Sequence, residues 1–496
     1  MSDSSIDLLR GGRLSELLDE AAEFTSSITD DLILIDVVGK INSAHMLMLY
    51  RKGLVKRRDA ELCINALCSI PNDLKLDPKL EDVHMNIESF VIGKAGEDSG
   101  GQINLGKSRN DQVATAIRMV AREFILTLVE ESIELEKVLL SKCKAHTDYL
   151  LPSFTHLQRA QPVTLSHHLL AHYDAISRNI DRLMGCFKNV NLSPMGAGAI
   201  ATVLFDLDRD YVAKTLGFDG LLENSIDAVS TRDFALEILT NISLLMLDVE
   251  RIANEIVLWS SSEFSFLEVS DEFTSTSSIM PQKKNPVVAE MIRSRTSIVL
   301  GDLFASLSIV KSLTLGYNLD LQDLTPRLWD GLRNTIKSVG IMSKMVKTIR
   351  FKREQMMASI DESTGAADLA NYLAVNSEIP FRKAHHIVGS LAKLSVENGI
   401  SFRMAIKDGL GDVSMKMIGK DIQIDSSQLD SILDPRKTIN SKSTRGGPSP
   451  TESERMITDR EKQLNLYSEL VESKRKALKE SQKSLENAIN DMIGGD

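Results

Sequence analysis

The stretch ATAIRMVAREFILTLVEESIELEKVLLSKCKAH, residues 114–146, decides the fold class of this chain. Glycine and proline are the residues that most often interrupt helices, and neither occurs between Gly106 and Pro152. Apolar side chains such as Ile117 and Val120 recur through the stretch at helical spacing. At about 1.5 Å per residue, the sequence predicts a helical rod roughly 50–60 Å long, several times the usual helix length.

A second stretch without glycine or proline covers residues 221–280, and its segment FALEILTNISLLMLDVERIANEIVLW is apolar on more than one face. A helix of that kind needs partners on several sides. We therefore predict an all-α fold with a large bundle of long helices, part of whose core comes from other subunits. Strand signals are scarce, since aromatic residues make up only 5% of the chain. The best strand candidate, DLILIDVV at residues 31–38, reads equally well as helix.

Segments rich in glycine and proline, together with the charge pattern, divide the chain into three predicted domains, all mostly helical. Residues 1–110 mix short helices with a glycine-rich end, and residues 111–360 contain the long helices. Residues 361–496 contain shorter helices, the loop STRGGPSP and a charged terminal helix from about Glu452. The lysine and glutamate residues of that last helix are typical of a solvated face beside an apolar stripe.

The composition indicates a soluble globular protein, with 496 residues, 43% of them hydrophobic and 26% charged. A formal net charge of -11 opposes generic binding to nucleic acid or to a membrane surface. No run approaches the roughly 20 apolar residues of a membrane span, and the polar N-terminus is unlike a signal peptide. Four cysteines without zinc-ligand spacing predict buried, reduced thiols and no metal site. We expect a cytoplasmic protein.

Two glycine-rich stretches match nucleotide-binding patterns. GQINLGKS at residues 101–108 fits the P-loop pattern, and GAGAIA at residues 196–201 fits the looser dinucleotide pattern. Both motifs require a buried parallel strand before the first glycine, and the preceding residues GKAGEDSG and NLSPM do not predict one. Nucleotide binding is therefore disfavoured. The glycines still indicate loop backbone that is open to an anion.

Four polar stretches have compositions that the packing of helices alone does not explain. They are GKSRNDQ (106–112), THLQRAQP (155–162), TSSIMPQKKNP (276–286) and YNLDLQ (317–322). Together they resemble the fumarase/aspartase superfamily of lyases, and the third is close to that superfamily's signature, Ser-Ser-x-Met-Pro-x-Lys-x-Asn-Pro. Within the superfamily, SRNDQ, HLQRAQP and YN-x-DLQ resemble the argininosuccinate lyase family. The similarity extends from FTSSI near the N-terminus through STRGGPSP, which is most of the chain.

The resemblance implies a β-elimination that releases fumarate from a succinyl group, without a metal or an organic cofactor. Such chemistry requires removal of a weakly acidic C–H proton, stabilisation of a dianionic aci-carboxylate and protonation of the leaving nitrogen. The resemblance also implies three helical domains in a homotetramer, whose central bundle brings GKSRNDQ, THLQRAQP and SSIMPQKKNP together from different chains. The implied partners are argininosuccinate and further copies of the chain.

Carried over by motif, the catalytic candidates are Ser277, His156 and Lys283. Ser277 is the first serine of its pair, six residues before the lysine, and His156 follows Thr155 in a stretch that we expect near a helix start. Serine is a poor base unless its alkoxide is stabilised, so Lys283 and nearby amides must lower its pKa. We favour Ser277 as base, with His156 positioning or relaying a proton to the leaving group, but the sequence does not settle which of the two is the base and which the acid. Asn285 reads as a helix N-cap and, with Lys283, suits a carboxylate.

The remaining substrate-binding candidates also follow from the resemblance. They are Ser27, Ser108, Arg109, Asn110, Thr155, Asn285, Tyr317 and Gln322. The chain departs from the family pattern where the usual lysine, three residues after the substrate glutamine, is Thr325. Further departures are Thr276 in place of glycine, Asn104-Leu105 in place of His-Thr, and Lys107 in place of arginine. The loss of the lysine removes an ion pair to substrate unless Lys283 or Arg327 compensates.

Three alternatives remain open at this point. The first is another fumarate-releasing lyase, such as adenylosuccinate lyase, which SRNDQ and HLQRAQP disfavour. The second is a catalytically silent structural homologue, of the kind known as crystallins in this family. Ser277, His156 and Lys283 speak against that reading, whereas Thr325 favours it. The third is an ATPase that uses the P-loop match.

Overall fold

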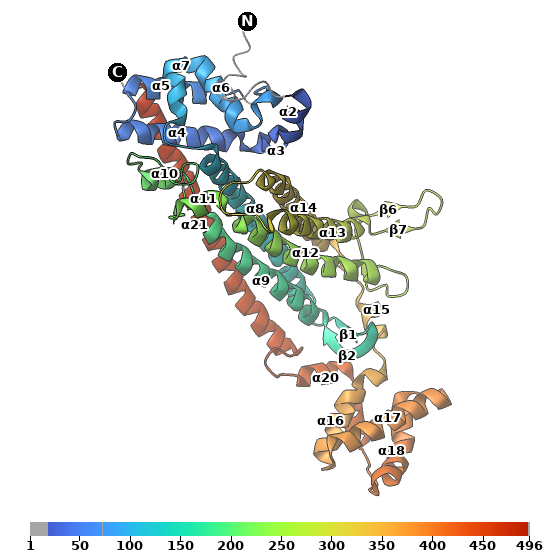
Figure 1. Ribbon diagram of the computed structural model, residues 1–496. Helices are drawn as coiled ribbons and strands as arrows, with labels where there is room; N and C mark the ends of the chain where they lie inside the picture. Colours follow the sequence, from blue (N-terminus) through green and yellow to red (C-terminus); the bar gives the residue numbers. More distant parts are fainter. Residues whose placement is uncertain (1–17, 72, 495–496) are drawn as a thin grey trace.

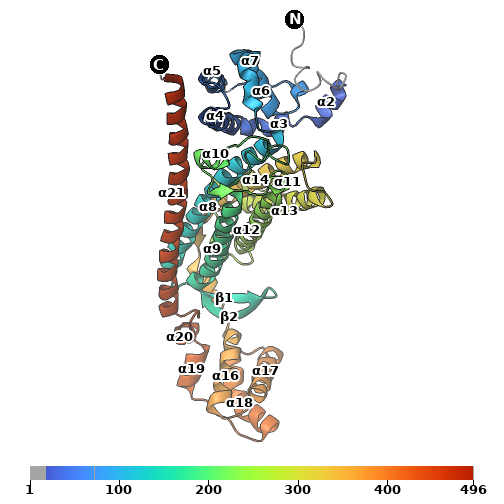
Figure 2. The same cartoon turned by 60° about the vertical axis from the view of Figure 1, so that its left-hand side comes forward.

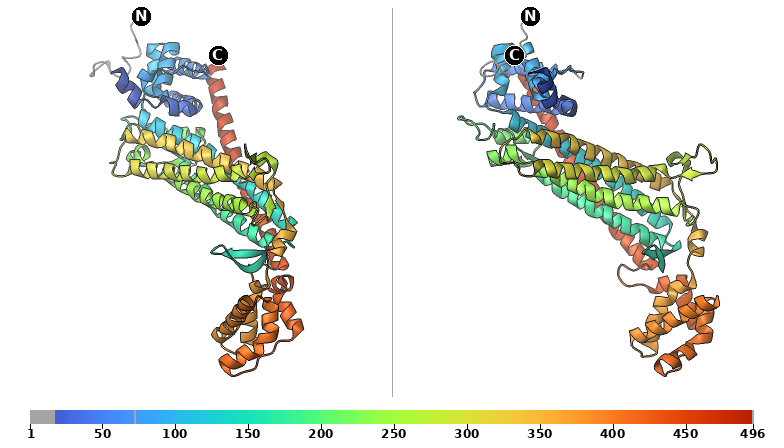
Figure 3. Two further views of the ribbon diagram at one scale, coloured as in Figure 1. Left: turned by 90° about the vertical axis from the view of Figure 1, so that its right-hand side faces the viewer. Right: turned by 45° about the vertical axis from the view of Figure 1, so that its right-hand side comes forward.

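Five long helices lie side by side and form the central bundle of the molecule (Figures 1 and 3). The structure is a computed structural model that describes residues 18–71 and 73–494. The longest of the five, α8 (Arg109–Ala145), has 37 residues and is therefore about 55 Å long. This helix confirms the rod predicted from the sequence. The other four are α9 (Leu165–Val190), α12 (Asp233–Trp259), α13 (Val287–Val310) and α14 (Asp320–Thr348).

Shorter helices cover the end of the bundle at which α8 begins (Figure 1). The stretch DLILIDVV is helical, because it spans the end of α3, a 3₁₀ turn and the start of α4. The helices of this region are α2 (Asp19–Thr25), α3 (Ile28–Asp31), α4 (Ile35–Arg51), α5 (Arg57–Cys68), α6 (Val83–Ala95) and α7 (Glu97–Gly100). The N-terminal residues 1–17, which bear on the signal-peptide prediction, lie outside the described part of the chain.

One segment of this region, Asp19–Arg51, is long and apolar enough to pass a length and composition test for a membrane-crossing helix. Its most apolar window is 61% buried inside the protein, as the core helix of a soluble protein is. The hydrophobicity of α4 is therefore explained by packing, since it buries Val38, Ile41 and Met46 completely.

The strands are few and short, except in one hairpin. Strands β1 (Leu150–Thr155) and β2 (Gln158–Thr164) pair antiparallel between α8 and α9. This hairpin was not predicted from the sequence, because its turn lacks the usual Asn-Gly or Asp-Gly. The other strands are two-residue pairs: β3 (Leu192–Ser193) with β4 (Gly220–Leu221), β5 (Leu267–Glu268) with β8 (Arg350–Phe351), and β6 (Ser275–Thr276) with β7 (Lys284–Asn285). Short helices α10 (Arg209–Thr215), α11 (Ser225–Ser230) and α15 (Arg353–Ala358) complete the connections.

The C-terminal region has a hydrophobic core of its own, centred on Leu369, Ile387 and Leu429. Its helices are α16 (Ala366–Asn376), α17 (Phe381–Asn398), α18 (Phe402–Ile418), α19 (Ser426–Leu433) and α20 (Pro435–Ser441). The 45-residue terminal helix, α21 (Pro450–Gly494), leaves this region and runs back along the bundle (Figures 1 and 2). Its apolar stripe belongs to the core of the bundle, and Arg475 forms ion pairs with Glu123 and Glu130 of α8. The domain limits at residues 110 and 360 stay a prediction.

The two false nucleotide motifs have a structural explanation. The first four residues of GQINLGKS form a 3₁₀ helix (Gly101–Asn104) directly after α7, so no strand leads into it. In GAGAIA, the backbone N–H groups of Gly196 and Gly198 donate hydrogen bonds of 3.0 and 2.8 Å to the Asp111 carboxylate. Both glycines have positive φ, at 83° and 66°, which side-chain-bearing residues rarely adopt. The anion held by this glycine loop is therefore an aspartate of the same chain.

The four cysteines are free thiols, as predicted. Cys63, Cys143 and Cys186 are buried, whereas Cys68 is exposed at the end of α5. The expectation of burial is therefore wrong for Cys68, because a helix end offers its last residue fewer neighbours. Burial raises the pKa of the Cys63 thiol to about 11, which keeps it protonated and unreactive.

Glu136 of α8 supplies a first testable prediction. Its side chain is fully buried beside Tyr173 and Ser177 of α9, and burial raises the pKa of its carboxyl from the usual 4.5 to about 8. Stability that depends on this proton is complete below about pH 4.5 and is lost as the pH rises through about 8. We expect Glu136→Gln to remove that loss, which is at most about 1.4 kcal/mol per pH unit. Thermal unfolding as a function of pH measures it.

The matched control for this prediction is Glu134→Gln, because Glu134 is an exposed residue of the same helix. We expect it to keep the pH dependence of the wild-type melting temperature. A Glu136→Gln protein that loses stability as steeply as the wild type between about pH 5 and about pH 8 contradicts the assignment.

Candidate active site

A cavity of about 280 Å³ lies where the start of α8 meets the start of α14. Four residues that the sequence analysis predicts to bind substrate line it: Arg109, Asn110, Tyr317 and Gln322. They come from sequence stretches about 200 residues apart, which packing brings together. The other lining residues are Ala21, Thr25, Glu81, Asp82, Val113 and Leu319.

The charged groups of the cavity are already paired with one another. The Nη1 atom of Arg109 lies 2.9 Å from Glu81 Oε2 and 3.1 Å from Asp82 Oδ2. The Nη1 atom of Arg109, a predicted substrate-binding residue, is therefore shared between two acids of the same chain. A cavity with both signs of charge is complementary to a zwitterionic group, such as the ammonium and carboxylate of an amino acid.

The amide side chains of the cavity are oriented by backbone carbonyls. Gln322 Nε2 donates a hydrogen bond of 2.9 Å to the carbonyl oxygen of Thr25. Asn110 Nδ2 donates one of 3.1 Å to the carbonyl oxygen of Ala199. These contacts tie α14 to the end of α2 and tie α8 to the glycine loop.

Ser27 is buried beside the cavity rather than open to it. Its hydroxyl donates to the Asp31 carboxylate, and its backbone N–H donates to the carbonyl of Glu81. Burial raises the pKa of the Asp31 carboxyl to about 7. The acids Asp31, Glu81 and Asp82 were not predicted from the sequence. Their signal was weak, because Asp31 opens an apolar stretch and Asp82 has the ordinary role of a helix N-cap.

Ser108 has a structural role that its motif also explains. It is the N-cap of α8 and forms a capping box with Asp111, whose carboxylate accepts a 3.0 Å hydrogen bond from the Ser108 backbone. The Ser108 hydroxyl accepts a 3.3 Å hydrogen bond from the backbone N–H of Asn110. A further contact from Ser108 to a substrate carboxylate stays a prediction.

Thr155 and His156 lie at the tip of the hairpin, and α9 begins only at Leu165, nine residues after His156. The expectation that His156 lies near a helix start is therefore wrong. Thr155 ends β1, while His156 and Leu157 form the two-residue turn with φ of 56° and 58°. This left-handed geometry is costly for residues other than glycine, and such strain is concentrated at functional sites. All three residues are exposed, so the turn presents the imidazole to solvent or to another chain.

Ser277 lies in the loop that joins β6 to β7 (Figure 1). Its Oγ accepts hydrogen bonds from the backbone N–H groups of Ile279 and Met280, at 3.3 and 3.1 Å. Donors aimed at an oxygen stabilise its anionic form, which is what a serine alkoxide requires. Ile279 is 86% exposed, so the loop is not packed on its own chain at this point.

Lys283 is exposed on the same loop, and its backbone N–H donates to the carbonyl of Met280, at 3.1 Å. Asn285 belongs to β7, and the N-cap of α13 is Pro286. The interpretation of Asn285 as N-cap is therefore wrong by one residue, because the β6–β7 pairing keeps Asn285 extended. Lys284, the neighbour of Lys283, forms an ion pair of 2.6 Å with Asp271.

The predicted site residues fall into two groups at opposite ends of the bundle. The cavity lies at the start of α8, and the hairpin follows the other end of that helix, about 55 Å away. The Ser277 loop precedes α13, whose 24 residues run back toward the cavity end over about 36 Å. Figure 3 shows the β6–β7 loop at the end of the bundle opposite the N-terminal helices. One chain therefore does not bring both groups together.

The residues that depart from the family pattern, or were expected to compensate for it, are buried or bonded within the chain. Thr325 is buried in α14, and Arg327, the residue expected to compensate for it, lies 3.4 Å from Asp302. Lys107 donates a hydrogen bond to the side chain of Asn42 at the base of the α8 start. These contacts give Lys107 a structural role where the family usually has arginine.

Comparison with known proteins first defines the class. A family model described as "Lyase" matches residues 69–301, and one described as "Argininosuccinate lyase C-terminal" matches residues 363–440. The solved structure of a class II fumarase from Schistosoma mansoni is 16% identical and has a TM-score of 0.71, over 82% of this chain and 90% of that one. The molecule thus has the helical fold of such lyases.

The family follows from closer relatives. An argininosuccinate lyase from Methanothrix thermoacetophila is 41% identical over 98% of both chains, and one from Methanococcoides burtonii is 42% identical over 94% of this chain and 95% of its own. An EDDS lyase solved with formate is 27% identical, with a TM-score of 0.87 over 93% of this chain and 92% of that one. The chain belongs to the argininosuccinate lyase family.

Proposed function

We propose that this protein cleaves argininosuccinate into L-arginine and fumarate in arginine biosynthesis. The observation that carries the proposal is the similarity to argininosuccinate lyases over nearly the whole chain, in a sequence that retains Ser277, His156 and Lys283. In the reaction, a base removes a proton from the succinyl carbon beside a carboxylate. The electron pair left behind forms the carbon–carbon double bond of fumarate, and the carbon–nitrogen bond breaks as the leaving nitrogen is protonated.

We assign Ser277 as the base, Lys283 and Asn285 as the groups that stabilise the aci-carboxylate, and His156 as the source of the proton. The two amide donors on Ser277 Oγ support the first assignment, since they favour the alkoxide. The strained hairpin turn supports the last, because it holds the imidazole outward. We assign the cavity at the start of α8 to the amino-acid end of the substrate, because the ammonium and carboxylate of that end are complementary to the acidic and basic side chains of the cavity.

We propose a homotetramer in which each site combines groups from different chains. The separation of the cavity from the hairpin and the loop in one chain supports this assembly. So does a row of exposed apolar side chains on α13, which a single chain leaves open to water: Met291, Ile298, Phe304 and Leu307. A bundle that continues into a second copy covers such a face, in line with the predicted sharing of the core.

Mixing inactive variants tests the shared site. A tetramer built from His156→Ala and Ser277→Ala chains contains some sites in which every group is intact, provided that the two groups come from different chains. We expect each variant alone to be nearly inactive and the mixture, unfolded and refolded together, to recover a substantial fraction of wild-type fumarate release. Variants refolded separately and then combined without exchange are the control. No recovery in verified hybrids argues against sharing.

The activity itself is tested by incubating the purified protein with argininosuccinate and following the ultraviolet absorbance of fumarate. Adenylosuccinate in the same assay separates the first alternative, and tight binding of argininosuccinate without turnover supports a silent homologue. We further propose that the protein acts in the cytoplasm as a soluble enzyme, because the apolar helix α4 is packed inside the fold.

A further inference from the structure

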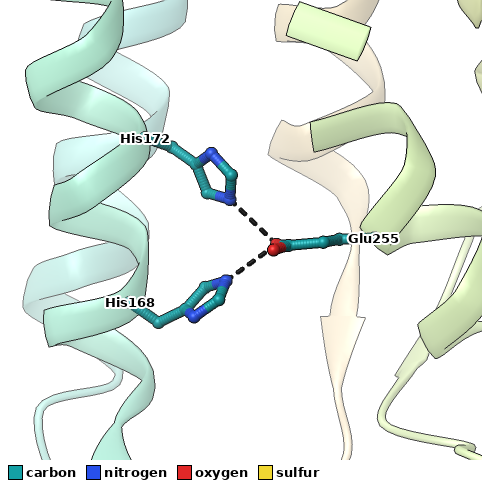
Figure 4. Close-up of side chains that lie close together, drawn as sticks. All are labelled: His168, His172 and Glu255. Atoms are coloured by element: carbon teal, nitrogen blue, oxygen red, sulfur yellow. Dashed lines mark hydrogen bonds and ion pairs between the residues drawn. The ribbon is translucent and has the colours of Figure 1, made fainter. Parts of the chain in front are cut away.

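Two histidines and a glutamate, none of them assigned to catalysis, meet between two helices of the bundle (Figure 4). His168 and His172 belong to α9, and Glu255 belongs to α12. The Nε2 atoms of the two imidazoles lie 2.7 and 2.8 Å from the same oxygen, Glu255 Oε2. The three ligand atoms all lie within 4.8 Å of one another.

The spacing of the histidines presents both rings on one face of α9. Residues four apart on a helix are neighbours, and pairs of histidines at this spacing are the helical half of many zinc sites. Figure 4 shows both rings pointing away from α9 toward the Glu255 side chain, which reaches across from α12. The arrangement converges on one point in the space between the two helices.

The donor set matches a divalent transition metal rather than calcium or magnesium. Two imidazole nitrogens and one carboxylate oxygen are the protein ligands of known three-ligand zinc sites, whereas calcium and magnesium prefer oxygen alone. Tetrahedral coordination at about 2.0–2.1 Å places ligand atoms about 3.3 Å apart. Each Nε2–Oε2 pair therefore needs to separate by about half an ångström to reach this spacing.

The surroundings hold the ligands in place and leave one side open. The Trp259 ring packs on the His168 ring with centroids 4.9 Å apart, and the two histidine rings are 5.3 Å apart. The side chain of His172 is 8% exposed, whereas those of His168 and Glu255 are 24% and 28% exposed. A partly open set of three ligands leaves a fourth coordination position for water.

We propose that His168, His172 and Glu255 form a binding site for one divalent transition-metal ion of the zinc or cobalt type, which clasps α9 to α12. Each imidazole must present an unprotonated Nε2 to the ion, so its proton moves to Nδ1 or to solvent and binding weakens at acid pH. The site is a structural one that stands apart from the elimination chemistry, and it does not depend on the proposed function.

The proposed metal site lies at the bases of two segments that carry predicted catalytic groups. His168 lies in the first turns of α9, directly after the hairpin that carries His156. Glu255 lies in the last turns of α12, just before the segment that leads to the Ser277 loop. A metal ion here ties together the bases of two segments that carry predicted catalytic groups, and it resists their separation on heating.

Cobalt and zinc titrations of the full-length protein test the site after treatment with a chelator. We expect Co²⁺ to produce visible d–d absorption that saturates at one ion per chain and is removed by Zn²⁺. We expect the double variant His168→Gln/His172→Gln to weaken Co²⁺ binding by about a hundredfold or more. One of the two exposed histidines of α17 supplies the control, because His385→Gln should bind Co²⁺ as the wild type does.

Thermal unfolding with and without Zn²⁺ gives a second readout that is independent of activity. Zn²⁺ should raise the melting temperature of the wild type and of His385→Gln, and should leave that of Glu255→Gln unchanged. Far-ultraviolet circular dichroism verifies that the variants are folded. The proposal is overturned if the wild type gives no saturable Co²⁺ absorption, or if the absorption persists in the folded double variant.

Discussion

Ser277→Ala should lower kcat for fumarate release by about 10³-fold or more, while KM changes less than tenfold. The hydroxyl that we assign as the base is then absent, whereas the substrate-binding groups remain. The effect is expected to be large because Oγ is held by two backbone donors, from Ile279 and Met280, and a water molecule in its place lacks that fixed position. Steady-state kinetics with argininosuccinate measure both constants.

The control for this experiment is the neighbouring serine. Ser278 is exposed in the same loop, and we have given it no part in the reaction. We expect Ser278→Ala to stay within about threefold of wild-type kcat, a difference of less than about 1 kcal/mol. If Ser277→Ala and Ser278→Ala retain similar activity, Ser277 is not the base, and His156 becomes the candidate for that role.

Asp111→Ala should lower the free energy of unfolding by about 3 kcal/mol or more. The Asp111 side chain is completely buried and accepts hydrogen bonds from the backbone N–H groups of Ser108, Gly196 and Gly198. Each buried donor that loses its partner costs about 1–3 kcal/mol. The same change loosens the start of α8, where Arg109 and Asn110 line the cavity, so substrate affinity should fall as well.

Chemical denaturation and KM are the measurements, and Asp208→Ala is the matched control. Asp208 caps α10 through one hydrogen bond of 2.9 Å to the backbone of Tyr211 and is only partly buried. We expect its removal to cost about 1 kcal/mol and to leave KM unchanged. An Asp111→Ala protein no less stable than Asp208→Ala shows that the carboxylate does not hold the glycine loop.

The sequence motifs predict which residues take part in the chemistry, but they do not predict which residues surround each of them. The run SRNDQ contains Arg109 and Asn110, which the structure brings to the cavity, but nothing in the run indicates that Glu81 and Asp82 are there too. The hairpin that carries His156 was missed because turn propensity is local, and this turn adopts φ values that its residues disfavour. The surrounding fold, rather than the dipeptide, holds the turn.

The metal-ligand cluster illustrates the same limit. The pair His168 and His172 stands in the sequence as HHLLAH, but no metal site was predicted from it. Glu255 lies 83 residues after His172 and becomes a neighbour only through the packing of α12 against α9. The spacing of residues in a sequence can indicate ligands that lie on one helix. A site between two helices depends on how those helices pack against each other, which the spacing does not indicate.

The sequence by itself determined the long helices, the absence of a nucleotide-binding sheet and the family. Helix length follows from a local rule, since an apolar period near 3.6 without glycine or proline continues until a breaker ends it. The tertiary structure alone decided which ends of the rods meet, which acids face Arg109, and that the cavity lies a helix length from the hairpin. Those relations depend on how side chains of distant segments pack. Helix propensity depends on residues that are close in the sequence, whereas the contact energy between two helices depends on residues that are far apart in it.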